Sequence, residues 1–299
     1  MNCPRATLLN DLTLSRITAG MWRLMDWNMS DQELLGYIDA CLALGVTSFD
    51  HADIYGDYGV EDAFGKALRI RPSLRAEIEL VTKVGIALVS PARPEHRLKH
   101  YNTGPAHIRH TVERSLRSFN TDYLDLLLIH RPDPLMRFDE VAAEVEKLKQ
   151  AGKIKAFGVS NFTPAQFQAV HSFTPLATNQ IELSPFHTSP LTDGTLDQLQ
   201  SIGAPPMIWS ALGGGRLFTE GDSAAARIRA TASQIAERHG VSVPTIIYAW
   251  LLQLPSSPIV ITGSRRLGGL RDAVSATALQ LERQDWFALL EAATGIEVA

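Results

Sequence analysis

The sequence contains little cysteine, no long apolar run and no excess of basic residues. Cys3 and Cys41 are its only cysteines, and two in 299 residues make no disulfide framework, so we expect a reducing, cytoplasmic setting. The apolar runs stay far below the roughly 18 residues that cross a bilayer. The first residues lack the apolar stretch and cleavage site of a secretory signal. A formal net charge of −4 offers no electrostatic basis for binding nucleic acid or an anionic membrane.

The sequence also lacks a G-x-G-x-x-G pattern after any predicted strand, which argues against a Rossmann-type dinucleotide site. No Ser/Gly-rich linker, low-complexity segment or block of like charge divides the chain. A chain of this length buries roughly 75% of the surface that its unfolded form exposes. We therefore expect residues 1–299 to form a single domain around one sizeable core.

Eight apolar runs of about strand length alternate with amphipathic segments. Their composition is typical of parallel strands that are buried on both faces. The runs are Ile17–Gly20, Val46–Phe49, Ile78–Thr82, Leu124–Ile129, Ile154–Val159, Ala177–Ile181, Met207–Trp209 and Ile259–Ile261.

The segments between these runs carry helix signals. Ser30 and Glu33 have the spacing of a capping box and open a helix that Gly45 can close. Thr163 and Gln166 repeat this box around a first-turn proline. Eight strands that alternate with helices favour an α/β fold of the closed (β/α)₈ (TIM) barrel type, with a doubly wound open sheet as the alternative.

A short β-hairpin is expected ahead of the first strand. The segment Thr7–Arg16 has the turn-forming pair Asn10-Asp11 at its middle. In a barrel, such a hairpin could close the bottom.

Ionisable side chains follow three of the predicted strands at their C-terminal ends. Asp50 ends the second strand, Lys83 the third and His130 the fourth. Taken singly, each has a structural explanation as a turn cap, a solvated rim lysine or a satisfied histidine. In a barrel, however, the C-terminal strand ends form one mouth where the chemistry lies, so their convergence favours a catalytic site.

These residues and their surroundings resemble the aldo-keto reductase superfamily. The segment Asp50-His-Ala-Asp-Ile-Tyr55-Gly56, with Glu61 beyond it, resembles the signature that supplies a catalytic Asp and Tyr, and Lys83 and His130 match the two other catalytic positions in order. The resemblance runs nearly end to end. It is closest to a bacterial branch of largely uncharacterised oxidoreductases, marked by His130-Arg-Pro-Asp-Pro134.

The resemblance also implies an NADP(H) site across the barrel mouth. In such a site Ser160, Asn161 and Gln180, whose side chains suit the donors and acceptors of an amide, hold the nicotinamide carboxamide. Trp209 stacks on the nicotinamide, and the segment after the last strand contacts the adenosine 2′-phosphate. The expected cofactor-binding residues are Gly20, Met21, Trp22, Ser160, Asn161, Gln180, Trp209, Ser210, Leu212, Gly213, Gly215, Gly263, Ser264, Arg265 and Arg266.

Two positions depart from the family pattern near the adenosine segment. Ala273 follows Asp272 where many members have Asn, and Gly269 stands where some have Arg. We expect Arg265 or Arg266 to supply the phosphate contact instead, at the start of a helix.

Carbonyl reduction needs a hydride donor, a proton donor and a group that holds the developing alkoxide. Tyr55 is the expected proton donor, and its free pKa of about 10 is high for this task. We expect the Lys83 ammonium to lower that pKa and Asp50 to keep Lys83 charged and oriented. His130 is expected to donate a hydrogen bond to the substrate carbonyl.

The predicted function is therefore NADP-dependent reduction of an aldehyde or ketone to an alcohol. Trp22, Tyr101 and Phe186 are expected to shape the substrate pocket, with Gly85–Pro105 as a loop over it. The histidine-rich stretches match no metal motif, so we expect no metal. A monomer or weak homo-oligomer acting on a small molecule is expected. Two alternatives stay open, a Schiff-base aldolase that uses Lys83 and a cofactor-binding redox sensor or regulatory subunit on the same fold.

Overall fold

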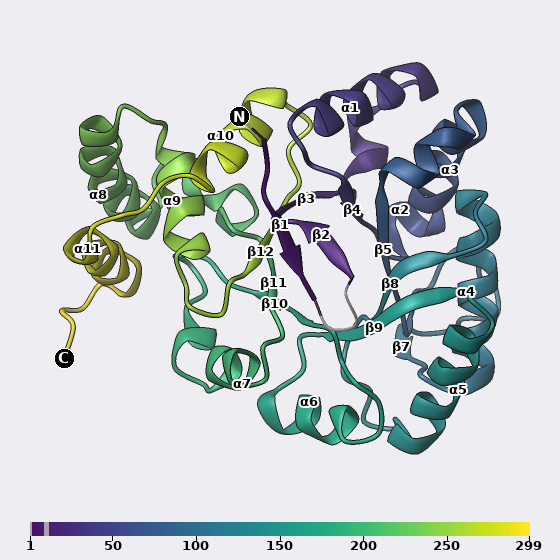
Figure 1. The fold of residues 1–299 in the computed structure, drawn as a ribbon. Coiled ribbons are helices and arrows are strands. Elements are labelled where there is room, and N and C mark those ends of the chain that lie inside the picture. The colour runs from purple at the N-terminus through teal and green to yellow at the C-terminus, as the bar shows by residue number, and fades with distance from the viewer. Residues whose placement is uncertain (1, 9–11) are drawn as a thin grey trace.

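The computed structural model describes residues 2–8 and 12–299 of the chain. Eight parallel strands close into a barrel in the order β10-β11-β12-β3-β4-β5-β8-β9 (Figure 1). The predicted (β/α)₈ barrel is confirmed, and the open-sheet alternative is wrong because β9 also pairs with β10, and β12 with β3. The barrel strands are β3 (Ile17–Gly20), β4 (Ser48–Asp50), β5 (Glu79–Val84), β8 (Leu124–Ile129), β9 (Ile154–Ser160), β10 (Asn179–Glu182), β11 (Met207–Trp209) and β12 (Ile259–Thr262).

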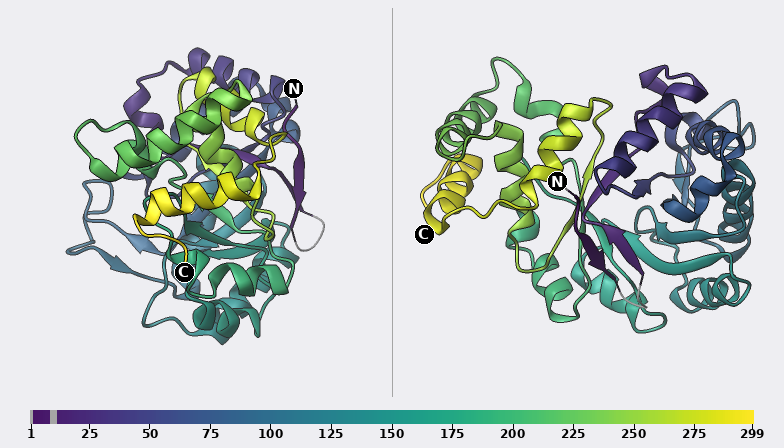
Figure 2. Two further views of the ribbon diagram at one scale, coloured as in Figure 1. Left: turned by 90° about the vertical axis from the view of Figure 1, so that its left-hand side faces the viewer. Right: turned by 45° about the horizontal axis from the view of Figure 1, so that its top comes forward.

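Helices surround the barrel on its outside, as the views in Figures 1 and 2 agree. Two of them, α8 and α9, lie in the connection between β11 and β12, and α11 follows α10 near the C-terminus. The helices are α1 (Asp31–Ala43), α2 (Tyr55–Tyr58), α3 (Val60–Ile70), α4 (Pro105–Phe119), α5 (Phe138–Gln150), α6 (Pro164–His171), α7 (Thr195–Ser201), α8 (Ser223–His239), α9 (Val243–Leu252), α10 (Leu267–Ala276) and α11 (Arg283–Thr294).

Both predicted capping boxes form. The Ser30 hydroxyl accepts from the backbone N–H of Glu33 at the start of α1, and the Glu33 carboxylate accepts from the Ser30 backbone. Thr163 and Gln166 make the same reciprocal pair ahead of α6. Each box supplies hydrogen-bond partners to backbone N–H groups that are otherwise unpaired at a helix start, and so sets the residue at which the helix begins.

The predicted N-terminal hairpin is confirmed by the antiparallel pairing of β1 (Arg5–Thr7) with β2 (Thr13–Ser15). Leu8, Leu12 and Leu14 pack with apolar side chains from inside the barrel, among them Val81 and Met207. The hairpin therefore covers the bottom of the barrel, and its two strands lie across that end in Figure 1. The predicted turn pair Asn10-Asp11 lies outside the described residues.

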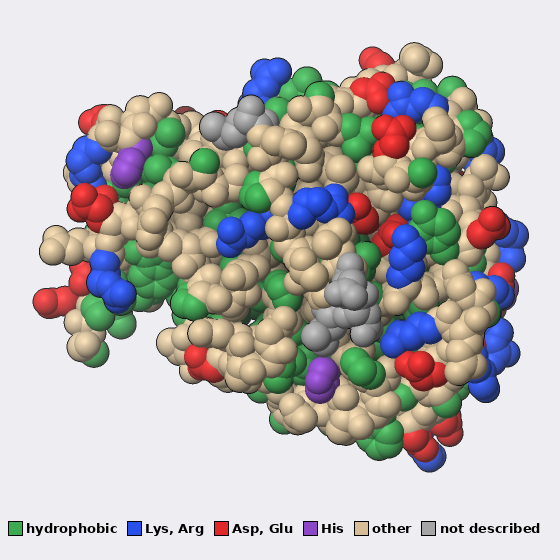
Figure 3. All heavy atoms as spheres, viewed as in Figure 1, with side chains coloured by type: hydrophobic (Ala, Val, Ile, Leu, Met, Phe, Trp, Pro, Cys, Tyr) green, Lys and Arg blue, Asp and Glu red, His purple; other side chains and the backbone are tan. Residues whose placement is uncertain are grey.

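A second antiparallel pair, β6 (Ile86–Ala87) and β7 (His100–Tyr101), stands in the loop between β5 and α4. On the face drawn in Figure 3, positive and negative side chains are interspersed. Across residues 2–8 and 12–299, no helix has the length and apolar character to cross a membrane.

Candidate active site

The C-terminal strand ends bring Lys83 into contact with two other predicted catalytic side chains. Its Nζ donates to Asp50 Oδ2 at 2.8 Å, to Asp50 Oδ1 at 2.9 Å and to Tyr55 Oη at 3.1 Å. The carbonyl oxygen of His51 also lies 2.7 Å from Nζ, a contact that the sequence analysis did not foresee. Parallel pairing of β4 with β5 aligns Asp50 with Val81, two residues before Lys83, and so places both side chains at the same mouth.

Lys83 is held as an ammonium ion inside the protein. Only 1% of the residue is exposed, so burial by itself disfavours its charge. Burial is the largest single effect, but the Asp50 carboxylate and the Tyr55 oxygen together outweigh it and raise the pKa of Lys83 above its ordinary value. The two hydrogen bonds to Asp50 and the raised pKa both favour the charged form of Lys83.

Lys83 acts on the pKa of Tyr55 in the predicted direction, but the net shift of that pKa is upward. Burial is the largest effect and raises the pKa of Tyr55, while the Lys83 charge acts in the predicted direction but opposes it only in part. Tyr55 therefore remains a protonated phenol near neutral pH. A protonated phenol is the form that a proton donor requires.

The backbone turns sharply just after Tyr55. Gly56, Asp57 and Tyr58 take φ values of 57°, 54° and 70°, all in the left-handed region. Asp57 and Tyr58 carry side chains, for which this region costs energy. At Gly56 an added Cβ would collide with Met25, so a glycine is needed there. The turn directs the phenol toward Lys83 and His130.

His130 lies at the end of β8 with its ring at 77° to that of Tyr55 and the ring centroids 5.8 Å apart. Burial, followed by the charges of Lys83, Arg131 and Lys99, lowers the pKa of His130 well below its usual range, so the imidazole is neutral. Its Nδ1 is buried and finds no hydrogen-bond partner among the described residues. Burying an N–H without an acceptor is the rarer arrangement in proteins, which favours the tautomer with the proton on Nε2.

A buried polar layer behind these side chains was not predicted. Arg114 donates to Asp53 at 3.3 Å, and the Thr82 hydroxyl donates to Glu61 at 2.6 Å. Burial raises the pKa of Asp53, with the nearby Glu61 acting in the same direction and Arg114 against it. Asp53 and Glu61 lie within the motif that the sequence analysis singled out, but their partners come from β5 and α4, which only the fold brings close.

The predicted nicotinamide-binding side chains form a connected set. Trp209 Nε1 donates to Asn161 Oδ1 at 3.2 Å, and Asn161 Nδ2 donates to Ser160 Oγ at 2.7 Å. The Ser160 hydroxyl donates to the Gln180 carbonyl at 2.9 Å, and Gln180 Nε2 donates to Asp50 Oδ1 at 2.8 Å. The set thus ends on the Asp50 carboxylate. Its amide and hydroxyl groups at the mouth fit the donors and acceptors of a carboxamide.

The loop after β11 contains Ser210, Leu212, Gly213 and Gly215, four of the predicted cofactor residues. Ser210, Gly213 and Gly215 have φ values of 63°, 63° and 105°. An added Cβ at Gly213 would overlap the Phe186 ring, so this glycine lets Phe186 pack against the loop. Phe186, predicted for the substrate pocket, is half-buried there, with the Arg216 guanidinium 4.7 Å from its ring centroid.

The segment Gly263–Arg266 joins β12 to α10. Ser264 Oγ accepts from the Arg266 backbone N–H at 3.2 Å, and Arg265 and Arg266 are exposed. Gly269 lies in the first turns of α10, where an added Cβ would lie 2.6 Å from Ser264 Oγ and the Ser264 side chain would have to shift. Ala273 is buried and belongs to the packing of α10.

The remaining predicted site residues lie at a strand end or in the loops that follow the strands. Gly20 ends β3, where an added Cβ would lie 2.8 Å from an Ile261 methyl group. Met21 is fully buried, whereas Trp22 is 63% exposed. Tyr101 lines a hollow of about 290 Å³ between the β6–β7 hairpin and the loop before α5, together with Thr103 and Asp133.

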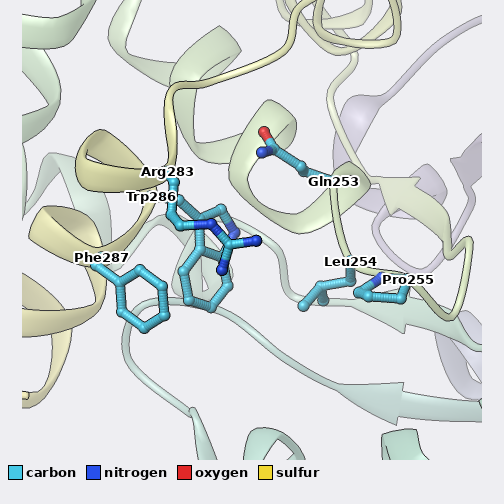
Figure 4. Close-up of a pocket in the computed structure, with 6 residues that line it drawn as sticks. All are labelled: Gln253, Leu254, Pro255, Arg283, Trp286 and Phe287. Atoms are coloured by element: carbon cyan, nitrogen blue, oxygen red, sulfur yellow. The ribbon is translucent and has the colours of Figure 1, made fainter.

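A further hollow of about 240 Å³ lies outside the barrel, between α9 and α11 (Figure 4). Gln253, Leu254, Pro255, Arg283, Trp286 and Phe287 line it, and none of them is a predicted site residue. Trp286 stacks on Trp250, and each indole N–H donates to the other residue's carbonyl, at 2.9 and 3.0 Å. This region therefore attaches α11 to α9. Within the described ranges, no group of three or more His, Cys, Asp or Glu side chains is arranged to hold a metal ion.

Comparison with known proteins gives a consistent result. The model of the Aldo/keto reductase family matches residues 16–293. The chain is 51% identical over 287 residues to oxidoreductase YdhF of Escherichia coli, covering 95% of each protein. It is 43% identical over 298 residues to a 6-dehydroglucose reductase of Agrobacterium fabrum, covering 99% of each. Glycerol dehydrogenase of Gluconobacter oxydans matches its structure with a TM-score of 0.85 at 27% identity, covering 96% of this chain and 94% of that one. The chain belongs to the aldo-keto reductase family.

Proposed function

We propose that this protein is an NADP-dependent reductase that converts a small aldehyde or ketone to an alcohol. The observation that carries the proposal is the contact of a buried, charged Lys83 with both Asp50 and Tyr55, beside a neutral His130. A proton donor, a charge that stabilises its anion and a hydrogen-bond donor for the carbonyl stand together at one barrel mouth. Two relatives that are named for reduction of 6-dehydroglucose and dehydrogenation of glycerol support a small substrate.

In the proposed reaction, His130 Nε2–H donates to the carbonyl oxygen and polarises the C=O bond. A bound NADPH would supply the hydride to the carbonyl carbon. As negative charge develops on the carbonyl oxygen, Tyr55 transfers its phenolic proton to it. Lys83 stabilises the resulting phenolate, and Asp50 keeps the ammonium in place.

We propose that the cofactor lies across the mouth, with its carboxamide at Ser160, Asn161 and Gln180 and its nicotinamide against Trp209. The exposed Arg265 and Arg266, at the start of α10, suit the 2′-phosphate that distinguishes NADPH from NADH. We further propose that residues 1–299 act as one domain, as a monomer or weak homo-oligomer in the cytoplasm. Two buried, unpaired cysteines suit such a reducing setting.

The Tyr55→Phe variant tests the proposal. It keeps the ring and removes the proton, so NADPH oxidation with a reducible carbonyl should slow by about 10²–10⁴-fold. The dissociation constant for NADPH should stay within about twofold, because the hydroxyl faces the substrate. Near-wild-type turnover in this variant would contradict the assignment of Tyr55 as proton donor.

The geometry disfavours the aldolase alternative. A Schiff base requires an uncharged, accessible lysine. Lys83 is 1% exposed, its pKa is raised, and its ammonium is already bound by oxygen acceptors. Borohydride treatment in the presence of a carbonyl compound should therefore leave Lys83 unmodified. The redox-sensor alternative predicts tight NADPH binding without turnover of any carbonyl, which the same kinetic measurements would reveal.

A further inference from the structure

Arg131 is a cation at the active-site mouth that the proposed mechanism does not use. It follows His130 directly at the end of β8, yet its guanidinium carbon lies 5.6 Å from the ring centroid of Trp209 on β11. Since β9 and β10 stand between these two strands in the barrel, the side chain reaches over the mouth. Its charge also acts on both His130 and Tyr55, lowering the pKa of each, which agrees with a position beside both reactive groups.

The N–H donors of Arg131 have no acceptor among the described residues. Within residues 2–8 and 12–299 its side chain makes no ion pair or hydrogen bond. Asp133, two residues on, instead accepts from the Thr103 hydroxyl at 2.8 Å and from the Leu135 N–H at 2.8 Å. Glu182 is aligned with Trp209 at the end of β10 but forms no ion pair with Arg131. A half-buried arginine with five N–H donors thus lies beside Trp209 at the mouth where the proposed function places the substrate carbonyl.

We propose that Arg131 is a specificity-determining residue that binds oxygen substituents of the substrate, and so selects oxygen-rich carbonyl compounds over hydrocarbon ones. The inference rests on the proposed function. The shared chemistry is an oxygen acceptor near the carbonyl, supplied either by a carboxylate or by hydroxyl groups. A carboxylate should bind Arg131 more tightly than hydroxyl groups do, because the planar guanidinium donates two charge-assisted hydrogen bonds to it.

Three four-carbon aldehydes separate these sources: butanal, D-erythrose and 4-oxobutanoate. In the Arg131→Met variant, kcat/KM should fall about ten- to hundredfold for 4-oxobutanoate and about two- to tenfold for D-erythrose. It should change less than about twofold for butanal, which offers no second oxygen. Comparing variants cancels the fraction of open-chain aldehyde, since this is a property of the substrate. Arg131→Lys should recover part of the loss with 4-oxobutanoate because it restores the charge without the fork.

Lys147→Met is the matched control. It removes one exposed cation from the outer face of α5 and should leave all three values unchanged. Equal losses with all three aldehydes in Arg131→Met, accompanied by weaker NADPH binding, would overturn the proposal, because Arg131 would then act through Trp209 on the cofactor. Unchanged values would also overturn it and make Arg131 an ordinary solvated side chain.

A binding measurement separates this inference from the proposed function. Butanoate and butanamide differ in charge but not in length, and Trp209 lies close enough to Arg131 to report binding by its fluorescence. Butanoate should bind about tenfold more weakly to Arg131→Met than to the unmodified protein, and butanamide about equally to both. Equal butanoate affinities would refute the role of Arg131 whether or not the protein turns over any aldehyde. Absence of NADPH oxidation with every aldehyde would instead refute the reductase function.

Discussion

The buried pair of Asp50 and Lys83 leads to a quantitative prediction for stability. Asp50→Asn keeps the size of the side chain and removes its charge, so the Lys83 ammonium is left with the His51 carbonyl, the Tyr55 hydroxyl and an amide oxygen. Breaking a buried ion pair by removing one partner costs about 3–5 kcal/mol, because the remaining charge stays out of water. With an unfolding entropy of about 2.1 cal/mol/K per residue, over 299 residues this lowers the Tm by about 5–8 °C.

The double variant Asp50→Asn/Lys83→Met tests whether the charges of Asp50 and Lys83 stabilise each other in the folded protein. It removes both charges, so its loss of unfolding free energy should be smaller than the sum of the two single losses, by about 2–3 kcal/mol. Urea unfolding of the four proteins, followed by tryptophan fluorescence, measures this coupling. Additive losses would refute the reasoning, because they would mean that each charge is stabilised independently of the other.

Three further predictions concern the site and its surroundings. His130→Ala should lower kcat/KM for a carbonyl substrate by about 10²-fold or more and leave NADPH affinity nearly unchanged; parallel losses in both measurements would indicate a structural histidine. NADPH should bind at least about tenfold more tightly than NADH, and joint replacement of Arg265 and Arg266 by Ala should remove most of this difference. Equal affinities for the two cofactors in the unmodified protein would exclude a 2′-phosphate clamp. Burial and the Lys83 charge lower the pKa of His51 to about 3, so below about pH 6.5 the unfolded chain binds more protons at this residue and the free energy of unfolding falls as the pH drops. His51→Leu should make that fall shallower in urea unfolding at pH 7 and pH 5; the same slope in both proteins would contradict it.

Local features of the sequence were sufficient to favour a barrel over an open sheet and to predict that Asp50, Lys83 and His130 lie at strand ends. Apolar runs of strand length and capping boxes depend on residues a few positions apart, so their spacing alone predicted the strands and the starts of α1 and α6. The sequence predicted that three side chains lie close together, because the parallel strands of a barrel place their C-terminal ends at one mouth. These side chains are Asp50, Lys83 and His130. The family resemblance added Tyr55, which lies in a turn and follows no periodic pattern.

Properties that depend on burial and on contacts between distant segments required the tertiary structure. The pKa of Tyr55 rises because burial outweighs Lys83, and the degree of burial is a property of the whole packed mouth. Gln180 donates to Asp50 across 130 residues of chain, and Arg131 reaches Trp209 over two intervening strands. Such distances follow from barrel closure and side-chain packing, which a linear pattern does not encode. The sequence by itself thus determined the alternation of strands and helices and the strand ends at which Asp50, Lys83 and His130 lie. The tertiary structure decided that the sheet closes into a barrel, and with it the burial, charge states and neighbours of these side chains.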